Sequence, residues 1–186
     1  MIADKVFENK DFSKDTLSAK EYDNCTFTAC SFSSVDLSEV SFLECTFDDC
    51  DFSMANLHTT ALKEVAFKNC KLLGVDFSGC NPFLLAMIFE GCQLNLASFY
   101  QLNLKGINFK NCNLAEADFT ETNLTGASFD GCDLNGATFE NTVLEKADFQ
   151  TSQNYSIDPE INRIRKAKFS IPEVVGLLDK YDIEIG

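Results

Sequence analysis

A large apolar side chain returns at every fifth position from residue 7 to residue 149, with one slip of two residues near residue 80. A period of five matches neither the roughly 3.6-residue turn of an α-helix nor the alternation of an ordinary β-strand. It suits a chain wound into square coils, in which each pentad forms one side and residues twenty apart are stacked. The pattern therefore predicts an all-β fold, a right-handed quadrilateral β-helix with a short C-terminal helical and strand tail.

The repeat falls into two blocks of 15 and 14 central residues, which predicts about seven coils and a length of roughly 34 Å at ~4.8 Å per coil. The centres of the first block are Phe7, Phe12, Leu17, Tyr22, Phe27, Phe32, Leu37, Phe42, Phe47, Phe52, Leu57, Leu62, Phe67, Leu72 and Phe77. Those of the second are Leu84, Phe89, Leu94, Phe99, Leu104, Phe109, Leu114, Phe119, Leu124, Phe129, Leu134, Phe139, Leu144 and Phe149.

The slip between the blocks contains the turn formers Gly79, Asn81 and Pro82. They predict a small bulge at residues 78–83 inside one solenoid domain of residues 1–151. The apolar residues around it either cover the bulge, which we favour, or form a contact patch. They are Leu73, Phe83, Leu85, Ile88, Leu96 and Tyr100.

The position two before each centre should also point inward, and most of the nine cysteines occupy it. A buried free thiol packs as a small hydrophobe, so we predict free, buried cysteines. Cys30, Cys50 and Cys70 should form one column, and Cys92, Cys112 and Cys132 another. A single histidine, and the lack of any CxxC motif, disfavour a zinc site. The sequence thus predicts no catalytic residue, metal or cofactor, and no enzyme.

A net charge of −14 argues against direct nucleic-acid binding, because phosphates would be repelled. This negative charge favours binding to a basic surface of a partner, or it only keeps the protein soluble. The lack of a long apolar run predicts no membrane span, and the first residues do not resemble a signal peptide, so we expect a cytoplasmic protein.

Two stretches, Ala117-Asp118-Phe119-Thr120-Glu121 and Ala147-Asp148-Phe149, carry the spacing of an A(D/N)LXX consensus. The chain in this respect resembles the pentapeptide-repeat family over about four fifths of its length, which implies the same coiled fold. Members of this family serve many roles, so the repeat alone does not fix a function.

The tail, residues 152–186, is predicted to cap the open end of the solenoid and to form a dimer. Asp158 and Pro159 should open a short helical turn, a second helix should begin near Ser170, and Ile183 to Ile185 could form a strand. This tail resembles that of the gyrase-protecting branch, which includes the Qnr quinolone-resistance proteins and the microcin B17 immunity protein McbG. The resemblance implies a cytoplasmic homodimer. Its predicted contacts are Phe169, Ile171, Val174, Leu177, Leu178, Tyr181, Ile183 and Ile185.

Acidic residues concentrate in residues 21–51 and 116–148. If the coil has four sides and the bulge skips none, one side carries acids and no lysine. We predict a partner-binding acidic face made of Asp36, Glu39, Asp76, Asp118, Glu121 and Glu140, with Glu116 and Asp133 on the adjacent side. The resemblance implies an acidic DNA mimic that binds DNA gyrase or topoisomerase IV and protects it from a toxin or quinolone. The alternative is a structural or scaffold solenoid with another protein partner.

Overall fold

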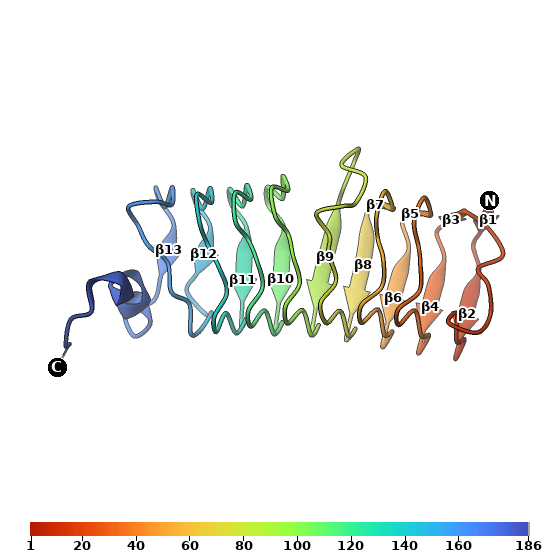
Figure 1. Cartoon of the computed structure of the whole chain (residues 1–186), viewed down its shortest axis with the longest axis horizontal. Helices are drawn as coiled ribbons and strands as arrows, with labels where there is room; N and C mark the ends of the chain where they lie inside the picture. The colour runs from red at the N-terminus through yellow and green to blue at the C-terminus, as the bar shows by residue number, and fades with distance from the viewer. Residues whose placement is uncertain (186) are drawn as a thin grey trace.

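The chain folds into a rod of stacked coils with its two termini at opposite ends (Figure 1). The structure, a computed structural model, describes residues 1–185. It has about eight turns of parallel β-solenoid, one more than the sequence pattern predicted. The extra turn arises because the ladder continues past residue 151 to the last strand, β13 (Lys168–Phe169), which pairs with β12 (Asp148–Phe149).

Two parallel sheets run along the rod, each built from one short strand per coil, and the shorter sheet covers only the N-terminal coils. The shorter sheet has the order β1-β3-β5-β7, with β1 at Ile2–Ala3, β3 at Glu21–Asp23, β5 at Ser41–Leu43 and β7 at Ala61–Lys63. The longer sheet has nine strands, from β2 to β13. Its other members are β2 (Val6–Glu8), β4 (Thr26–Thr28), β6 (Thr46–Asp48), β8 (Val65–Lys68), β9 (Met87–Glu90), β10 (Asn108–Lys110), β11 (Ser128–Asp130) and β12.

The coil has four sides, and the pairing register fixes which residues share a side. The shorter sheet lies on the first side and the nine-stranded sheet on the second. The third and fourth sides are joined by isolated bridges, such as Asn113↔Asp133 and Asp118↔Thr138. Partners are twenty residues apart, except across the slip, where Phe67 pairs with Phe89. The slip therefore lengthens one coil by two residues and skips no side, which is the condition on which the acidic residues were placed.

Aromatic rings fill the core and stack between coils. The rings of Phe77, Phe99 and Phe119 follow one another at centroid distances of 5.0 Å, with interplanar angles of 2° and 3°. Rings from the second and fourth sides meet edge to face, as Phe99 and Phe109 do at 5.6 Å. Burying one such side chain stabilises the fold by about 1.5–3 kcal/mol. A row of them therefore ties each coil to the next.

The corners of the coil explain the rest of the five-residue pattern. In most coils the residue two after a centre adopts positive φ, which glycine tolerates best, as at Gly106 (φ 70°) and Gly126 (φ 69°). Other residue types nevertheless hold the same conformation, including Leu96 (φ 60°) and Glu116 (φ 59°). The hydrogen bonds between coils support this conformation whatever the side chain.

The slip, at residues 81–86, forms a loop that projects from the rod just before β9 (Figure 1). Of the residues expected to cover the bulge, Phe83 is 66% exposed, and Leu73, Ile88, Leu96 and Tyr100 are exposed as well, so the expected cover is not formed. Leu84 is 65% exposed. Leu84 was also expected to be a core centre, and this prediction is wrong. Its neighbour Leu85 is the residue that packs against the core. The two extra residues lift this part of the chain away from the coil, so the inward position shifts by one.

The C-terminal tail differs from the predicted helix and strand. Two short 3-10 helices, η1 (Val174–Leu177) and η2 (Asp179–Tyr181), replace the expected helix. Residues 183–185 are irregular and exposed instead of forming a strand. Gly176 is buried in η1 and accepts a hydrogen bond from Ile157 N–H at 2.9 Å. This close approach to the last coil holds the tail against the end of the rod.

Candidate partner-binding surface

The predicted acidic residues lie on the third and fourth sides of the rod, as the column assignment required. Asp36, Asp76 and Asp118 each stand directly before a centre of the fourth side and belong to its row of bridges. Glu39 and Glu121 occupy corners of that side, with φ values of 63° and 56°. The acids are thus repeated along one edge of the molecule at intervals of whole coils.

The remaining three predicted residues extend this surface toward the C-terminal coils. Glu140 follows the centre Phe139 on the fourth side and is exposed. Glu116 is exposed at a corner of the third side, and Asp133 is partly exposed on the same side, bridged to Asn113. We call the eight residues Asp36, Glu39, Asp76, Glu116, Asp118, Glu121, Asp133 and Glu140 the acidic surface.

Four of these carboxylates also stabilise the backbone of the coil, a role that the sequence pattern did not reveal. Each aspartate of the acidic surface accepts a hydrogen bond from the backbone N–H two residues later. The Oδ1 to N distances are 3.0 Å for Asp36, 2.8 Å for Asp76, 2.9 Å for Asp118 and 3.1 Å for Asp133. This Asx turn closes each side of the coil, which explains why the repeat prefers Asp or Asn before the centre.

At Asp36, hydrogen bonds also favour the charged form of the carboxylate. At Asp36, the Ser38 hydroxyl and the Ser38 backbone N–H lower the pKa below its ordinary value of 3.8. Hydrogen bonds to the ionised form stabilise it, so the charge persists well into the acidic range. Asp36 therefore presents a fixed negative charge at neutral pH.

Ion pairs neutralise the other sides of the rod more than this surface. On the first and second sides, Arg163 pairs with Glu145 at 2.6 Å, Lys168 with Asp148 at 2.9 Å and Lys110 with Glu90 at 2.8 Å. Within residues 1–185, only Glu39 of the acidic surface takes part in an ion pair, with Lys20 at 3.2 Å. Among the described residues, seven of the eight carboxylates of the acidic surface therefore take part in no ion pair.

The nine cysteines are buried and free, as predicted, but their columns were assigned wrongly. Because the slip skips no side, Cys30, Cys50, Cys70, Cys92, Cys112 and Cys132 form one continuous ladder. Its members donate to carbonyl oxygens of the second side: Cys50 Sγ lies 3.3 Å from Phe27 O and Cys92 Sγ 3.4 Å from Phe67 O. Burial raises the pKa of the Cys45 thiol to about 11 and that of Cys80 to about 12. Such thiols are protonated and unreactive at neutral pH.

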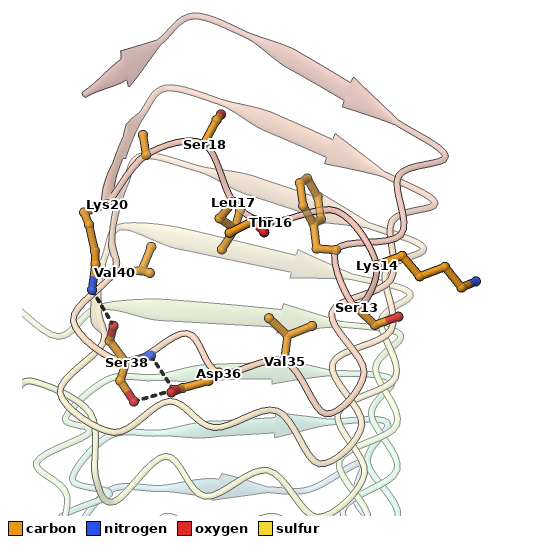
Figure 2. A pocket seen from close by; sticks show the side chains of 12 residues that line it. Ser13, Lys14, Thr16, Leu17, Ser18, Lys20, Val35, Asp36, Ser38 and Val40 are labelled. Carbon is orange, nitrogen blue, oxygen red and sulfur yellow. Dashed lines mark hydrogen bonds between the residues drawn. The ribbon is translucent and has the colours of Figure 1, made fainter.

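A cavity of about 400 Å³ opens on the N-terminal coil, where residues 13–19 run apart from residues 35–40 (Figure 2). Half-buried Leu17 and Val35 line it, together with serine and threonine hydroxyls. Its lysines already have partners: Lys14 pairs with Asp11 at 2.6 Å, and Lys20 with Glu39. The cavity is also lined by the Asp36 carboxylate, whose Oδ1 accepts hydrogen bonds from the Ser38 N–H and the Ser38 hydroxyl.

The predicted dimer residues divide into two groups. Phe169 stacks on Phe149 at 5.4 Å, and Leu177 also packs against the core, so these two residues hold the tail to its own coil. The other six are exposed on the outer surface of the tail. They are Ile171, Val174, Leu178, Tyr181, Ile183 and Ile185.

Two further observations bear on the kind of site present. Among the described residues, no three His, Cys, Asp or Glu side chains are grouped as ligands of one metal ion would be. None of the helices in residues 1–185 has the length and apolar character needed to cross a bilayer.

Residues 20–82 and 83–155 match the family described as the pentapeptide repeat region. Among curated protein sequences, no match was found. The structure is similar to that of QnrB1, a plasmid-mediated fluoroquinolone resistance protein, with a TM-score of 0.58 and 18% identity; the alignment covers 97% of this chain and 99% of that one. It also aligns with HetL, a pentapeptide repeat protein involved in heterocyst differentiation regulation from the cyanobacterium Nostoc sp. strain PCC 7120, with a TM-score of 0.40 and 17% identity over 91% of this chain and 87% of that one. At 18% identity, the similarity to QnrB1 establishes a shared fold.

Proposed function

The chain belongs to the pentapeptide-repeat family, and from this premise we propose that it is an acidic binding protein that occupies the DNA-binding groove of a type II topoisomerase such as DNA gyrase. In this role it would act without catalysis, as a protein of the resistance or immunity type. The single observation that carries the proposal is the acidic surface. It is a row of carboxylates along one edge of the rod, of which only Glu39 forms an ion pair within residues 1–185.

The shape of the rod supports this proposal. Eight coils at ~4.8 Å each span roughly 38 Å, close to the length of one turn of B-DNA at about 34 Å. A groove that binds DNA is lined with basic residues and accommodates a rod with a negative surface. Complementary charge of this kind mainly steers association and fixes orientation.

Full-length similarity to QnrB1 gives a second, weaker support. QnrB1 is a plasmid-mediated fluoroquinolone resistance protein, and the alignment with it covers 97% of this chain. The C-terminal coils carry Asp118, Glu121 and Glu140 close together, so we assign the largest contribution to these three residues. If two copies join through their tails, these coils lie beside the centre of the dimer.

The proposal is tested by removing charge without removing hydrogen bonds. Replacing Asp118 by Lys would delete the acceptor of the Thr120 N–H, so a charge reversal would disturb the coil as well as the surface. The triple variant Asp118→Asn, Glu121→Gln and Glu140→Gln keeps an oxygen acceptor at each position. We expect it to lose most of the effect of the wild-type protein on gyrase supercoiling, measured with and without a quinolone or a peptide toxin.

The matched control removes three charges at the far end of the rod, through Glu8→Gln, Asp48→Asn and Asp49→Asn. This control should retain the effect. Any wild-type effect should also weaken as salt rises, since exposed charges are screened beyond about 8 Å at physiological ionic strength. Equal losses in the two triple variants, or a wild-type protein that never alters gyrase activity, would refute the proposal in favour of a scaffold with another protein partner.

A further inference from the structure

One asparagine of the acidic surface region is followed directly by glycine, and this pair is unique in the chain. Asn135 and Gly136 are both exposed at a corner of the third side, in the coil that also contains Asp133. Gly136 has a φ of 70° and presents no side chain that would shield its backbone nitrogen.

The backbone nitrogen of Gly136 is released from the hydrogen-bond ladder. At the same corner of earlier coils, the N–H groups of Gly74, Leu96 and Glu116 donate to the next coil at 2.9, 3.0 and 2.8 Å. The Gly136 N–H has no hydrogen-bond partner within residues 1–185. The cause lies one coil further on, where Tyr155 turns into the core and its carbonyl oxygen faces Gly176 instead of Gly136.

Other asparagines lack this combination. The residues after Asn95, Asn103, Asn113 and Asn123 are all leucines, and each leucine N–H is held by a carbonyl of the next coil. The side chain of Asn135 makes no hydrogen bond in the described chain, while its own N–H donates to Asp133 Oδ1 at 3.1 Å. The Asn135 amide group is thus free to rotate toward the neighbouring nitrogen.

We propose that Asn135–Gly136 is a self-modification site, at which the asparagine converts to aspartate or isoaspartate in the folded protein. After water or hydroxide removes its proton, the Gly136 nitrogen attacks Cγ of Asn135. A bond forms between this nitrogen and Cγ, the bond from Cγ to Nδ2 breaks, and the side-chain nitrogen leaves as ammonia. Water then opens the cyclic imide at either carbonyl, and no oxidant or reductant is needed.

The product places a new carboxylate among existing ones. Glu116 lies over Gly136, with its Cγ 3.3 Å from the position that a Cβ on Gly136 would occupy, and Asp133 is in direct contact with Asn135. Each conversion therefore adds one negative charge to the acidic surface. The isoaspartate form also lengthens the backbone at this corner.

The experiment follows the folded, full-length protein during incubation at mildly alkaline pH, with peptide mapping by mass spectrometry and an isoaspartate-specific assay. Modification should accumulate at Asn135 well ahead of every other asparagine. In Gly136→Ala the rate should fall by about an order of magnitude, because the added methyl group hinders the attacking nitrogen. This variant should fold, since Leu96 and Glu116 hold the same positive φ at this corner.

A second variant, Asn135→Gln, keeps the amide but lengthens the side chain, and it should also resist modification. Retention of the thermal transition shows that each variant is folded. Equal rates in wild type and Gly136→Ala, equal modification of many asparagines, or modification confined to protein unfolded in urea would each overturn the proposal.

Discussion

At the residue scale, the inward position two before a centre accepts several types of side chain. A backbone carbonyl oxygen of the preceding coil lies beside this position and can accept a hydrogen bond from it. The Thr122 and Thr142 hydroxyls donate to Phe99 O and Phe119 O, each at 2.8 Å, while fully buried. Asn162 Nδ2 makes the same contact with Phe139 O at 2.8 Å. A buried polar group with a partner costs little, so threonine, cysteine and asparagine can replace alanine in this position.

The buried thiols predict a loss of stability at alkaline pH. Burial raises the pKa of Cys45 from 9.0 to about 11 and that of Cys80 to about 12. Because the folded-state pKa is the higher one, this contribution to stability is fully present below pH 9 and is lost as pH rises through about 11 to 12. The midpoint of urea unfolding should fall across this interval.

The control for this prediction is the double variant Cys45→Ala and Cys80→Ala, since alanine already fills the same inward position at Ala117 and Ala127. Its unfolding midpoint should depend less on pH over the same interval. An identical alkaline slope in the variant and in wild type would show that other groups cause the loss.

At the element scale, the projecting loop is the least integrated part of the solenoid. Phe83 and Leu84 are exposed, and the Lys63 ammonium lies 5.7 Å from the centroid of the Phe83 ring. Leu85 packs against the core. Leu85 therefore holds the loop to the core, whereas the side chains of Phe83 and Leu84 remain exposed to solvent.

This arrangement predicts unequal effects of substitutions within one loop. Replacing Phe83 and Leu84 together by Ser should change the free energy of unfolding by no more than about 0.5 kcal/mol, as for ordinary surface positions. Leu85→Ala should destabilise by about 1–3 kcal/mol, because it removes buried methyl groups. Chemical denaturation measures both, and a large loss in the Phe83/Leu84 variant would restore the interpretation that these residues cover the coil.

At the scale of the whole molecule, the two ends of the rod differ in chemistry. The N-terminal coil ends in exposed edge strands and carries Lys5, Lys10 and Lys20 at positions that point inward in later coils. The C-terminal end carries exposed apolar side chains held in place by Lys180, which pairs with Asp158 at 2.9 Å and Glu160 at 2.6 Å. An apolar end favours association with a second copy.

We predict that the protein is a homodimer through this end. The triple variant Leu178→Ser, Ile183→Ser and Ile185→Ser should sediment as a monomer with an unchanged unfolding transition, since all three side chains are exposed within the chain. Phe169 and Leu177 are left intact because they support the last coil. The control Val6→Ser removes an exposed apolar group from the opposite end and should leave the dimer intact. A wild-type protein that is monomeric at micromolar concentration would contradict the prediction.

The five-residue pattern by itself determined the solenoid and the buried thiols. It placed the acids in columns only on the condition of four sides and a slip that skips none, a condition that the pairing of Phe67 with Phe89 fulfils. It could do so because each pentad contacts mainly the pentads twenty residues away, so local spacing specifies the packing. Three features depended on the tertiary structure: the outward path of residues 81–86, the joining of the cysteines into one ladder, and the extra coil that follows Phe149. These features arise where the repeat is broken, and there the path of the chain depends on which side chains and carbonyls of the neighbouring coil remain available.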